Sequence, residues 1–563
     1  MRTRGFLAVG VAAAVWLGGP PSAEAARMAI GIAPGVHPAT VAKAVERRTG
    51  RKPQSLAPIR ALVVNARIGT SFAGIRGIRY VEPVGARHLA FTPTDPFVSR
   101  QWYLTESRFY QPWLTLPSFE RIPVAVIDSG VDAGHPELKG RILDAKSFVG
   151  GPACTVSSCT DPLGHGTFVA GLIAANFDNG IGIAGLAPSS QLLVAKVVTP
   201  SRAIPIDAEA RAIRWAVDNG ARVINMSLGG LRDPLDPNLD GYSRLEADAV
   251  SYAVKNGVVV VAAAGNSDGA PSSPWNYASY PAALPHVLGV SAYGPGGIVP
   301  TFSNRDRIFD DVAAPGVQIF SVFPRSLTAR FPSCSDQGYS SCGPDDYREA
   351  QGTSFAAPQV SAAAAVLLSL QPLLKADQVT SILERTAVDM NSANGCPNCA
   401  PGRDPLTGWG KLDVAAAIGA LSGHVPVADR YEPNDDAGPR AYALHSVKGA
   451  ERRLSASVDF WDDQDDVYAI SLKAEQRVYI GLTPDTVPSG DLGLALWLPG
   501  TTSIGDVRGS RRRVRTSARA GGRQYFAYRA RKAGTYYVQV RMSSPGTTRY
   551  RLTIVKGTAP ALP

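Results

Sequence analysis

The sequence predicts an α/β protein whose main domain has a mostly parallel central sheet flanked by helices. Between about residues 96 and 420, short β-branched runs such as VAVID and GVVVV alternate with amphipathic patterns such as AEARAIRWAVDNG. Continuous apolar strands separated by helices are typical of a parallel sheet that is buried on both faces. In such sheets ligands bind beyond the carboxyl ends of the strands, so we expect the chemistry there.

Length and composition fit several folded domains. The chain has 563 residues, of which 45% are hydrophobic and 18% charged, and it contains 56 glycines. The formal net charge is +10, and the densest basic run is RGSRRRVRTSARAGGR at 508–523. Because no nucleic-acid motif accompanies this run, we interpret it as a solvated loop between strands and predict no nucleic-acid partner. A cell-wall or polysaccharide contact stays open.

The first 25 residues have the pattern of a secretory signal peptide. Arg2 and Arg4 precede an apolar run from Phe6 to Leu17, and the small-residue signal AEA ends at Ala25. A membrane anchor is the alternative, but the run is short and a Gly-Pro-Pro break follows it. We therefore predict a secreted, extracellular protein with no membrane span after signal removal, and leave cell-wall association open.

Export changes the interpretation of the six cysteines, because an oxidising compartment favours disulfides. They fall in neighbouring pairs, and we predict local pairing: Cys154 with Cys159, Cys334 with Cys342, and Cys396 with Cys399. The CPNC segment leaves a redox role or half of a zinc site open, although no second CxxC and no nearby histidine supports a metal.

Residues 26–95 are predicted to form a small α+β module. An apolar stretch RMAIGIA, a helical pattern HPATVAKAVERRTG and a strand-like IRALVVNA precede IRGIRYVEP, which fits a second helix or a strand. The following TPTDPFVSRQWYL is rich in turn formers and is interpreted as an extended linker.

Residues 426–558 are predicted to form a separate antiparallel β-sandwich. After VPVADRYEPNDD the pattern changes to aromatic and β-branched strands separated by Gly/Pro turns, for example DVYAISL, RVYIGLTP and GTYYVQVRM.

Three residues suited to nucleophilic catalysis lie at the ends of predicted strands or helices. Asp128 closes the strand VAVID, His165 opens an apolar helix in GHGTFVAG, and Ser354 opens another in GTSFAAPQV. Singly they could be a turn former, a core histidine and a helix cap. Jointly, their Asp-His-Ser order is that of a serine-protease triad. Between Asp128 and Ser354, His135 is interpreted as a turn or helix start and His286, which leads into VLGVSA, as structural.

The segments VAVIDSGVD, GHGTFVAG and GTSFAAPQV together resemble the signatures of the subtilisin-like serine proteases. The resemblance implies a subtilisin-like fold over residues 96–421, with Asp128, His165 and Ser354 as the triad. VVVVAAAGNSDG resembles the family's oxyanion segment, which makes Asn266 the side-chain donor. NMSLGG resembles the strand that pairs with substrate backbone. The substrate-binding residues implied are Ser227, Leu228, Gly229 and Gly265.

Two flanking resemblances complete the prediction. Residues 26–95 occupy the place of a subtilisin propeptide, an inhibitor and folding aid, although a permanent N-terminal domain is the alternative. The C-terminal region resembles bacterial pre-peptidase C-terminal domains, in which acidic residues sometimes bind structural calcium. The oxygen ligands so implied are Glu432, Asn434, Asp435, Asp463 and Asp465, against the alternative of a solvated acidic loop.

These observations predict a secreted serine endopeptidase that is made as a self-processing precursor and needs no cofactor for its chemistry. Its partners would be protein or peptide substrates and its own propeptide, and its C-terminal domain could contact cell wall, matrix or substrate proteins. The rival hypothesis is a catalytically inactive scaffold whose β-sandwich binds a surface polymer or protein.

Overall fold

The computed structural model forms two compact units, Met1–Ala90 and Phe91–Pro563. The residues that the structure describes are 25–67, 70–84, 92–113, 120–151, 154–199, 201–330, 341–342, 346–423, 429–444, 451–460, 463–486, 491–502, 504, 512–518, 523–544 and 546–557. The predicted signal peptide before Ala25 lies outside them.

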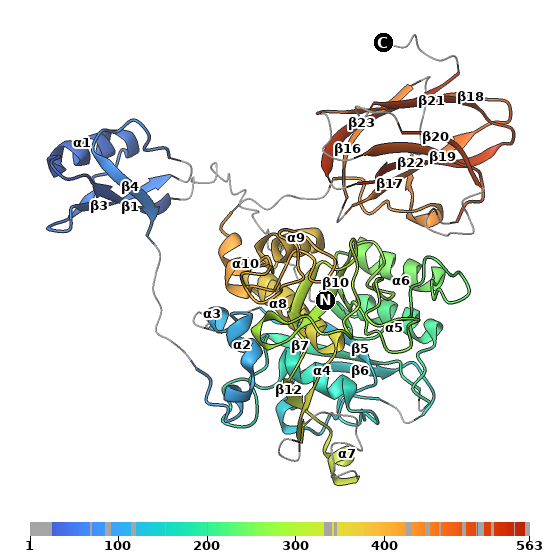
Figure 1. The fold of residues 1–563 in the computed structure, drawn as a ribbon, viewed down its shortest axis with the longest axis horizontal. Helices are drawn as coiled ribbons and strands as arrows, with labels where there is room; N and C mark the ends of the chain where they lie inside the picture. Colours follow the sequence, from blue (N-terminus) through green and yellow to red (C-terminus); the bar gives the residue numbers. More distant parts are fainter. Residues whose placement is uncertain are drawn as a thin grey trace, which may run out of the picture. The chain divides into compact units, whose positions relative to one another are not determined.

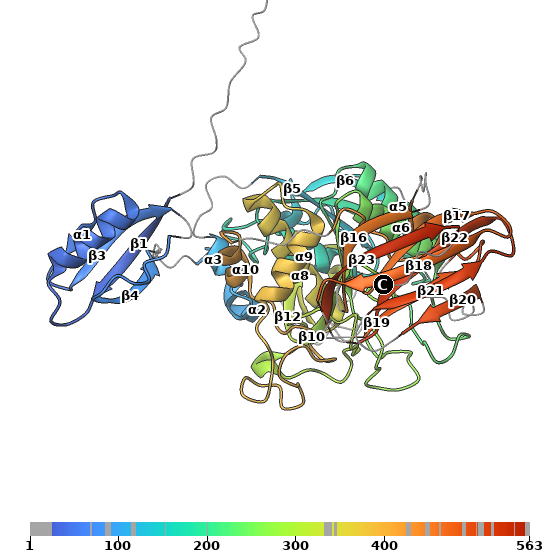
Figure 2. The ribbon, with the colours of Figure 1, turned by 90° about the horizontal axis from the view of Figure 1, so that it is seen from above.

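The first unit is an antiparallel sheet with one helix on a face, as Figures 1 and 2 show. Its strand order is β2-β3-β1-β4. The elements are β1 (Ala25–Ile32), α1 (Pro38–Thr49), β2 (Gln54–Leu56), β3 (Ala61–Arg67) and β4 (Ile78–Pro83). Proline in the first turn of α1 and Gly50 in the left-handed conformation after its end mark the helix boundaries. The segment that the sequence left as a helix or a strand is the strand β4.

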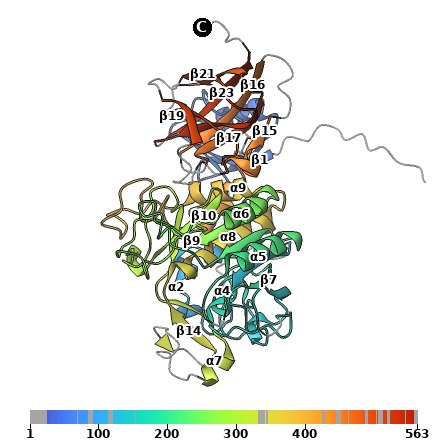
Figure 3. The ribbon, with the colours of Figure 1, turned by 90° about the vertical axis from the view of Figure 1, so that its right-hand side faces the viewer.

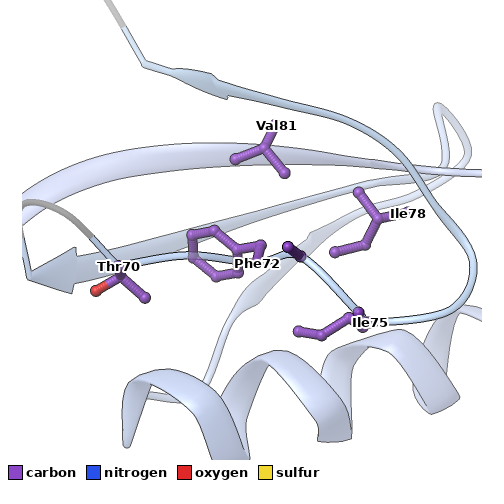
Figure 4. A pocket seen from close by; sticks show the side chains of 7 residues that line it. Thr70, Phe72, Ile75, Ile78 and Val81 are labelled. Atoms are coloured by element: carbon purple, nitrogen blue, oxygen red, sulfur yellow. The ribbon is translucent and has the colours of Figure 1, made fainter.

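A shallow apolar hollow lies beside the loop that precedes β4. Figure 4 shows the side chains of Phe72, Ile75, Ile78 and Val81 around it. Phe72 belongs to the core of this unit, and Ile75 and Ile78 pack against that core. The hollow is therefore the edge of a small hydrophobic core.

The second unit is built on a seven-stranded sheet whose neighbouring strands are all parallel. The strand order is β11-β10-β9-β8-β5-β7-β6. The strands are β5 (Ile122–Asp128), β6 (Ile142–Ser147), β7 (Ser190–Lys196), β8 (Val223–Met226), β9 (Val259–Ala263), β10 (Val287–Tyr293) and β11 (Val312–Pro315). The predicted mostly parallel sheet is confirmed.

Helices cover both faces of this sheet, as expected for strands that are apolar on both sides. One face packs against α4 (His165–Ala174), α8 (Thr353–Leu370) and α9 (Ala376–Thr386), and the other against α5 (Ile206–Asp218) and α6 (Arg244–Lys255). Among the described residues, α8 is the one helix long and apolar enough to cross a membrane, but 89% of it is buried inside the protein.

The predicted linker before β5 is wrong in part, because its second half is packed into the core. Residues 98–106 form η1 (Val98–Arg100) and α2 (Trp102–Glu106). Tyr103 is fully buried and donates a hydrogen bond to Phe320 O at 2.7 Å. The side chain of Gln101 bonds the backbone of Ala184 in both directions, at 2.9 Å each.

The remaining elements of this part surround the sheet. A small three-stranded sheet has the order β12-β14-β13. The elements are α3 (Tyr110–Trp113), η3 (Pro136–Leu138), η4 (Pro295–Gly297), β12 (Ile319–Val322), α7 (Arg325–Arg330), β13 (Ser341–Cys342), β14 (Tyr347–Ala350) and α10 (Val414–Ala420).

The C-terminal part consists of two sheets (Figure 3), with strand orders β15-β17-β22-β19-β20 and β16-β23-β18-β21. All pairings are antiparallel except β15 with β17. The elements are η6 (Gly438–Arg440), β15 (Tyr442–Ala443), β16 (Glu451–Asp459), β17 (Asp465–Leu472), β18 (Arg477–Pro484), β19 (Leu492–Trp497), β20 (Arg513–Ser517), β21 (Gln524–Arg529), β22 (Gly534–Met542) and β23 (Thr547–Lys556).

The described part of the basic run at 508–523 contains a strand, where the sequence predicted a loop. Its central residues form β20, an edge strand that pairs with β19. The guanidinium of Arg513 lies 5.9 Å from the ring centre of Trp497. Charged side chains suit an edge strand because they discourage pairing with other chains.

Two of the three predicted disulfides are present, Cys154–Cys159 and Cys396–Cys399. The CPNC segment thus holds a local disulfide. The prediction for Cys334 and Cys342 lies outside the described residues, because the position of Cys334 is not among them.

Candidate active site

Asp128 and His165 meet at the carboxyl edge of the central sheet. Asp128 is the last residue of β5 and His165 is the first residue of α4. His165 Nδ1 lies 2.9 Å from both carboxylate oxygens of Asp128. The Asp128 side chain is 2% exposed and the His165 side chain 30%. The carboxylate is therefore shielded from water while the imidazole stays accessible.

A buried hydrogen-bond network fixes this pair. The Ser129 hydroxyl donates to Asp161 Oδ1 at 2.7 Å and accepts from Gly166 N at 2.9 Å. Asp161 also accepts from the backbone and the hydroxyl of Thr167, both at 2.8 Å. Gly166 has no room for a side chain, because a Cβ there would lie 2.1 Å from Gly130 O. The first turn of α4 is thus locked against the strand end that carries Asp128.

The electrostatics of the pair favour a protonated imidazole. Burial lowers the pKa of His165, but the charge of Asp128 and its hydrogen bond outweigh burial, and the net pKa is raised. Asp161 adds a smaller effect in the same direction. Such an imidazole is a stronger base than free histidine and its imidazolium is stabilised.

Ser354 lies in the first turn of α8, where helix N–H groups lack intrahelical partners. Its hydroxyl donates to Ser227 O at 3.1 Å, and no hydrogen bond in the described structure joins it to His165. A hydroxyl can change acceptor by rotation about one side-chain bond, and catalytic hydrogen bonds are often loose in ligand-free structures. His165 does lie beside the same turn, with its ring centre 5.4 Å from that of Phe355.

Asn266 follows the central strand β9 and is anchored to the same helix end. Its Oδ1 accepts from the backbone and the hydroxyl of Thr353, both at 3.1 Å. The opposite end of the amide, Nδ2, has no hydrogen-bond partner among the described residues and lies 3.5 Å from where a Cβ of Gly352 would be. One side of the amide is therefore fixed, and the other is left as a donor next to Gly352, where α8 begins.

The residues predicted to bind substrate have different surroundings. Ser227 is buried, and its hydroxyl donates to Ser354 O at 2.7 Å. Leu228 is half-buried and Gly229 is exposed, which leaves the Gly229 backbone accessible. Gly265 has φ of 98°, and a Cβ there would lie 2.2 Å from Ser279 Oγ. This packing requires glycine at 265 without reference to a substrate.

A chain of polar side chains next to Ser354 was not predicted from the sequence. Ser361 donates to Asn225 Oδ1 at 2.8 Å, and Asn225 Nδ2 donates to Ser227 Oγ at 2.9 Å. Ser227 Oγ in turn donates to Ser354 O. Asn225 and Ser361 are fully buried. Polar residues in an otherwise apolar strand and helix are the signal that points to such a chain.

The predicted metal ligands are brought together in part. Glu432 and Asp435 lie with His286 in one group whose ligand atoms are all within 4.8 Å, and Glu432 lies with Asp429 and Asp466 in another. Asn434 donates to Asp466 Oδ1 at 2.6 Å. Asp463 interacts electrostatically with the same carboxylates. We call Asp429, Glu432, Asp435, Asp463, Asp466 and His286 the seam cluster.

Neither of these groups includes Asp463, and the structure places Asp465 in other contacts. It forms an ion pair with Arg541 at 3.1 Å and accepts from Gln539 Nε2 at 2.7 Å. Successive side chains of a strand point to opposite faces, so Asp466 joins the cluster and its neighbour does not. Asp429, Asp466 and His286 were missed because nothing local in the sequence places them together.

Several buried oxygens in this region have no hydrogen-bond partner among the described residues, which fits a cation. They are Glu432 Oε1, Asn434 Oδ1 and Asp463 Oδ1. Burial, and then mutual repulsion, raises the pKa of Asp463 and of Asp466 well above the usual carboxyl value. An all-oxygen set of carboxylates and an amide is the donor chemistry that calcium prefers.

Comparison with known proteins agrees with the geometry. Residues 120–410 match the model of the Subtilase family. Subtilisin DY of Bacillus licheniformis is 37% identical over 272 residues, which are 48% of this chain and 85% of that protein. The cell wall-associated protease of Bacillus subtilis (strain 168) is 29% identical over 476 residues, 78% of this chain and 48% of that protein.

Among solved structures, fervidolysin from Fervidobacterium pennivorans, a keratinolytic enzyme related to subtilisin, covers 90% of this chain and 69% of its own at 24% identity, with a TM-score of 0.49. The family match spans more than half of the chain and includes Asp128, His165, Asn266 and Ser354. The chain belongs to the subtilase family and is a hydrolase of the subtilisin type, a serine protease.

Proposed function

We propose that this protein is a secreted serine endopeptidase that cleaves peptide bonds through an acyl-enzyme on Ser354 and matures by cutting its own precursor. The observation that carries the proposal is that the Asp128–His165 pair and Asn266 both lie at the N-terminal end of α8, which carries Ser354. Asp128 holds His165 at 2.9 Å, and Asn266 is anchored to the residue that precedes Ser354.

The proposed reaction assigns one task to each residue. The Ser354 hydroxyl gives up its hydrogen bond to Ser227 O. Its Oγ then attacks the substrate carbonyl carbon while its proton passes to His165 Nε2. Asp128 stabilises the imidazolium that forms. The oxyanion accepts hydrogen bonds from Asn266 Nδ2 and from Ser354 N, which has no partner among the described residues. His165 then protonates the leaving amine, and water, activated by the same imidazole, releases the acyl group.

Substrate backbone is proposed to lie along Ser227, Leu228, Gly229 and Gly265. The exposed backbone at Gly229 supports this placement, because an extended peptide pairs through main-chain hydrogen bonds. Residues 26–95 are proposed to be the propeptide of the protease. A parallel sheet with long-range pairing folds slowly, which gives a removable folding aid a purpose.

The flanking regions suggest where the enzyme works. The leader pattern and the disulfides support export. The C-terminal sandwich is proposed to contact cell wall, matrix or substrate proteins, in line with the name of the cell wall-associated relative. No nucleic-acid partner and no membrane span after signal removal are proposed.

Calcium is proposed as a structural ion and not as a participant in the reaction. Asp429, Glu432, Asn434, Asp463 and Asp466 would hold it through side-chain oxygens. Its charge would offset the repulsion between buried carboxylates and thereby stabilise the C-terminal part. A calcium chelator should then lower the thermal midpoint without stopping turnover at once.

The test is the size of the secreted protein. Ser354→Ala should accumulate as a precursor that retains residues near 26–90, because it cannot cut itself. Ser369→Ala is the matched control, since Ser369 lies on the same helix and, among the described residues, its hydroxyl bonds within that helix, to Val366 O. Normal maturation of Ser354→Ala would mean that another protease makes the cut.

A fluorophosphonate probe separates the enzyme from the inactive-scaffold alternative. Covalent labelling of Ser354 in the mature protein supports the proposed chemistry. A folded, processed protein that takes no label would leave the scaffold as the better hypothesis.

A further inference from the structure

His286 of the catalytic part reaches the acidic turn of the C-terminal part. Its Nε2 lies 2.8 Å from Asp435 Oδ1 and 3.5 Å from Glu432 Oε2. His286 has φ of 59°, a left-handed conformation that few residues other than glycine adopt. The chain thus holds an uncommon backbone conformation at the residue that reaches across.

Other contacts confirm that this is where the two parts meet. Lys255 on α6 donates to Pro439 O at 3.1 Å. Arg440 donates to the Tyr242 hydroxyl at 3.4 Å and lies 3.6 Å from Asp248. The His286 contact is therefore one part of a continuous seam between α6, the loop before β10 and residues 432–440.

Among the described residues, three polar atoms of the seam cluster are buried without a hydrogen bond of regular geometry; Asp463 Oδ1, named above, is one, and the other two belong to the group with His286. One is His286 Nε2, although Asp435 Oδ1 is close enough, so the direction and not the distance is unsuitable. The other is Glu432 Oε1, on a side chain that is 7% exposed. Buried polar atoms without partners cost free energy unless an ion or another group satisfies them.

The concentration of negative charge in the seam cluster favours bound cations. Asp463 interacts with four other carboxylates, those of Asp429, Glu432, Asp435 and Asp466. A single imidazolium offsets one of these five negative charges. One divalent cation among the oxygen ligands and a second beside His286 would offset four of them.

The ligand types distinguish the two positions. An imidazole with two carboxylates suits zinc, whereas calcium takes oxygen ligands. Zinc bonds of about 2.0–2.2 Å in a tetrahedron place neighbouring ligand atoms roughly 3.3–3.6 Å apart. The distance from His286 Nε2 to Glu432 Oε2 already has this value, at 3.5 Å. The 2.8 Å distance to Asp435 needs to widen by less than about 1 Å.

We propose that His286, Glu432 and Asp435 form a zinc site that clamps the catalytic part to the C-terminal part, with water as the fourth ligand. Glu432 belongs to both groups of ligands, so it would bridge the zinc and the calcium positions. The site is structural and does not depend on catalysis by Ser354.

The test is zinc binding by the full chain, with Ser354→Ala included to prevent self-digestion and calcium in excess to fill the oxygen site. The parent chain should bind one zinc ion that His286→Gln does not bind. Zinc should raise the melting temperature of the parent and not of His286→Gln. Asp465→Asn is the matched control, because Asp465 is an acidic neighbour already paired with Arg541, and it should behave as the parent.

Equal zinc binding by His286→Gln and the parent would overturn the proposal, because the ion would then lie elsewhere, for example on His165. Absence of zinc binding by the parent chain would also overturn the proposal, because His286, Glu432 and Asp435 would then form an ion pair only. If His286→Gln fails to fold in calcium, Asp435→Asn serves in its place and must show the same loss.

Discussion

The described residues include two histidine–aspartate pairs of nearly equal length in very different surroundings. His165 Nδ1 lies 2.9 Å from Asp128, and His286 Nε2 lies 2.8 Å from Asp435. Asp128 closes a central parallel strand, whereas Asp435 lies in a turn among four further carboxylates. Distance alone therefore does not identify a catalytic pair.

The direction of the imidazole separates the two pairs. At Asp128 the ring presents Nδ1 to the carboxylate, which leaves Nε2 for proton transfer with Ser354. In the other pair the His286 ring presents Nε2 to the carboxylates of Asp435 and Glu432, so this nitrogen is not available for proton transfer to a substrate. The first pair therefore suits the proposed general base, and the second suits the proposed zinc ligand.

Replacement of each aspartate by asparagine should give the largest contrast. Asp128→Asn is expected to lower kcat by about 10⁴-fold, the magnitude known for this triad position in related serine proteases. Asp435→Asn should leave kcat within a factor of about two, because Asp435 takes no part in the proposed reaction. Steady-state kinetics on matured enzymes measure both. A comparable fall in kcat for Asp435→Asn would erase the distinction drawn between the pairs.

Asn266→Ala tests the donor that completes the catalytic side of the comparison. The fold should persist and kcat should fall ~10² to 10³, with little change in KM, because the amide acts mainly in the transition state. That magnitude is the one established for subtilisin itself. A variant that melts earlier but keeps kcat would show that Asn266 serves to cap α8 through Thr353 and not to bind the oxyanion.

The positions of the three proposed triad residues were predictable because local sequence carries their geometry. A strand that ends in Asp128, and helices that begin at His165 and next to Ser354, bring the three residues to one edge of a parallel sheet. Asn266 follows the same rule at the end of β9. The motifs thus encode both the residue and its place.

The seam cluster was predicted only in part because tertiary contacts build it. His286 is more than 140 residues from Asp435 in sequence, and nothing around VLGVSA indicates an acidic partner. Asp465 and Asp466 differ by strand register, which the sequence DDQDD does not settle. In the same way, the turn-forming composition of residues 92–104 concealed the burial of Tyr103, which depends on the distant Phe320.

A buried pair of glutamates, with no histidine in it, provides a reference for the two histidine–aspartate pairs. Glu209 on α5 and Glu246 on α6 are each 2% exposed. Burial raises the pKa of Glu209 to about 7, and burial with the charge of Glu209 raises the pKa of Glu246 to about 9. Since the folded state holds these protons more tightly than the unfolded state, their contribution to stability is full below about pH 4.5 and is lost as the pH rises toward 9.

Glu246→Gln should therefore be more stable than the parent at alkaline pH. The free energy of unfolding should differ by a few kcal/mol, which corresponds to about one to three pKa units at about 1.36 kcal/mol per unit. The amide still donates a hydrogen bond to Glu209 and does not ionise. Denaturant unfolding at pH 5 and pH 9, with an inactive Ser354→Ala background, measures the difference. Parallel stability curves for parent and variant would mean that the pair does not share a proton.

The smallest expected effect is the position of the pH profile. His165 must be neutral to accept the serine proton, so kcat/KM should rise with pH as the imidazole deprotonates. Because Asp128 and Asp161 raise the pKa of His165 against the effect of burial, the midpoint should lie above the ordinary histidine pKa of about 6.5, and activity should plateau in mild alkali. His286 is not in the catalytic pair, so His286→Gln should leave this midpoint unchanged while Asp161→Asn should lower it. An acidic optimum, or a midpoint that follows His286, would place the essential base outside the Asp128–His165 pair.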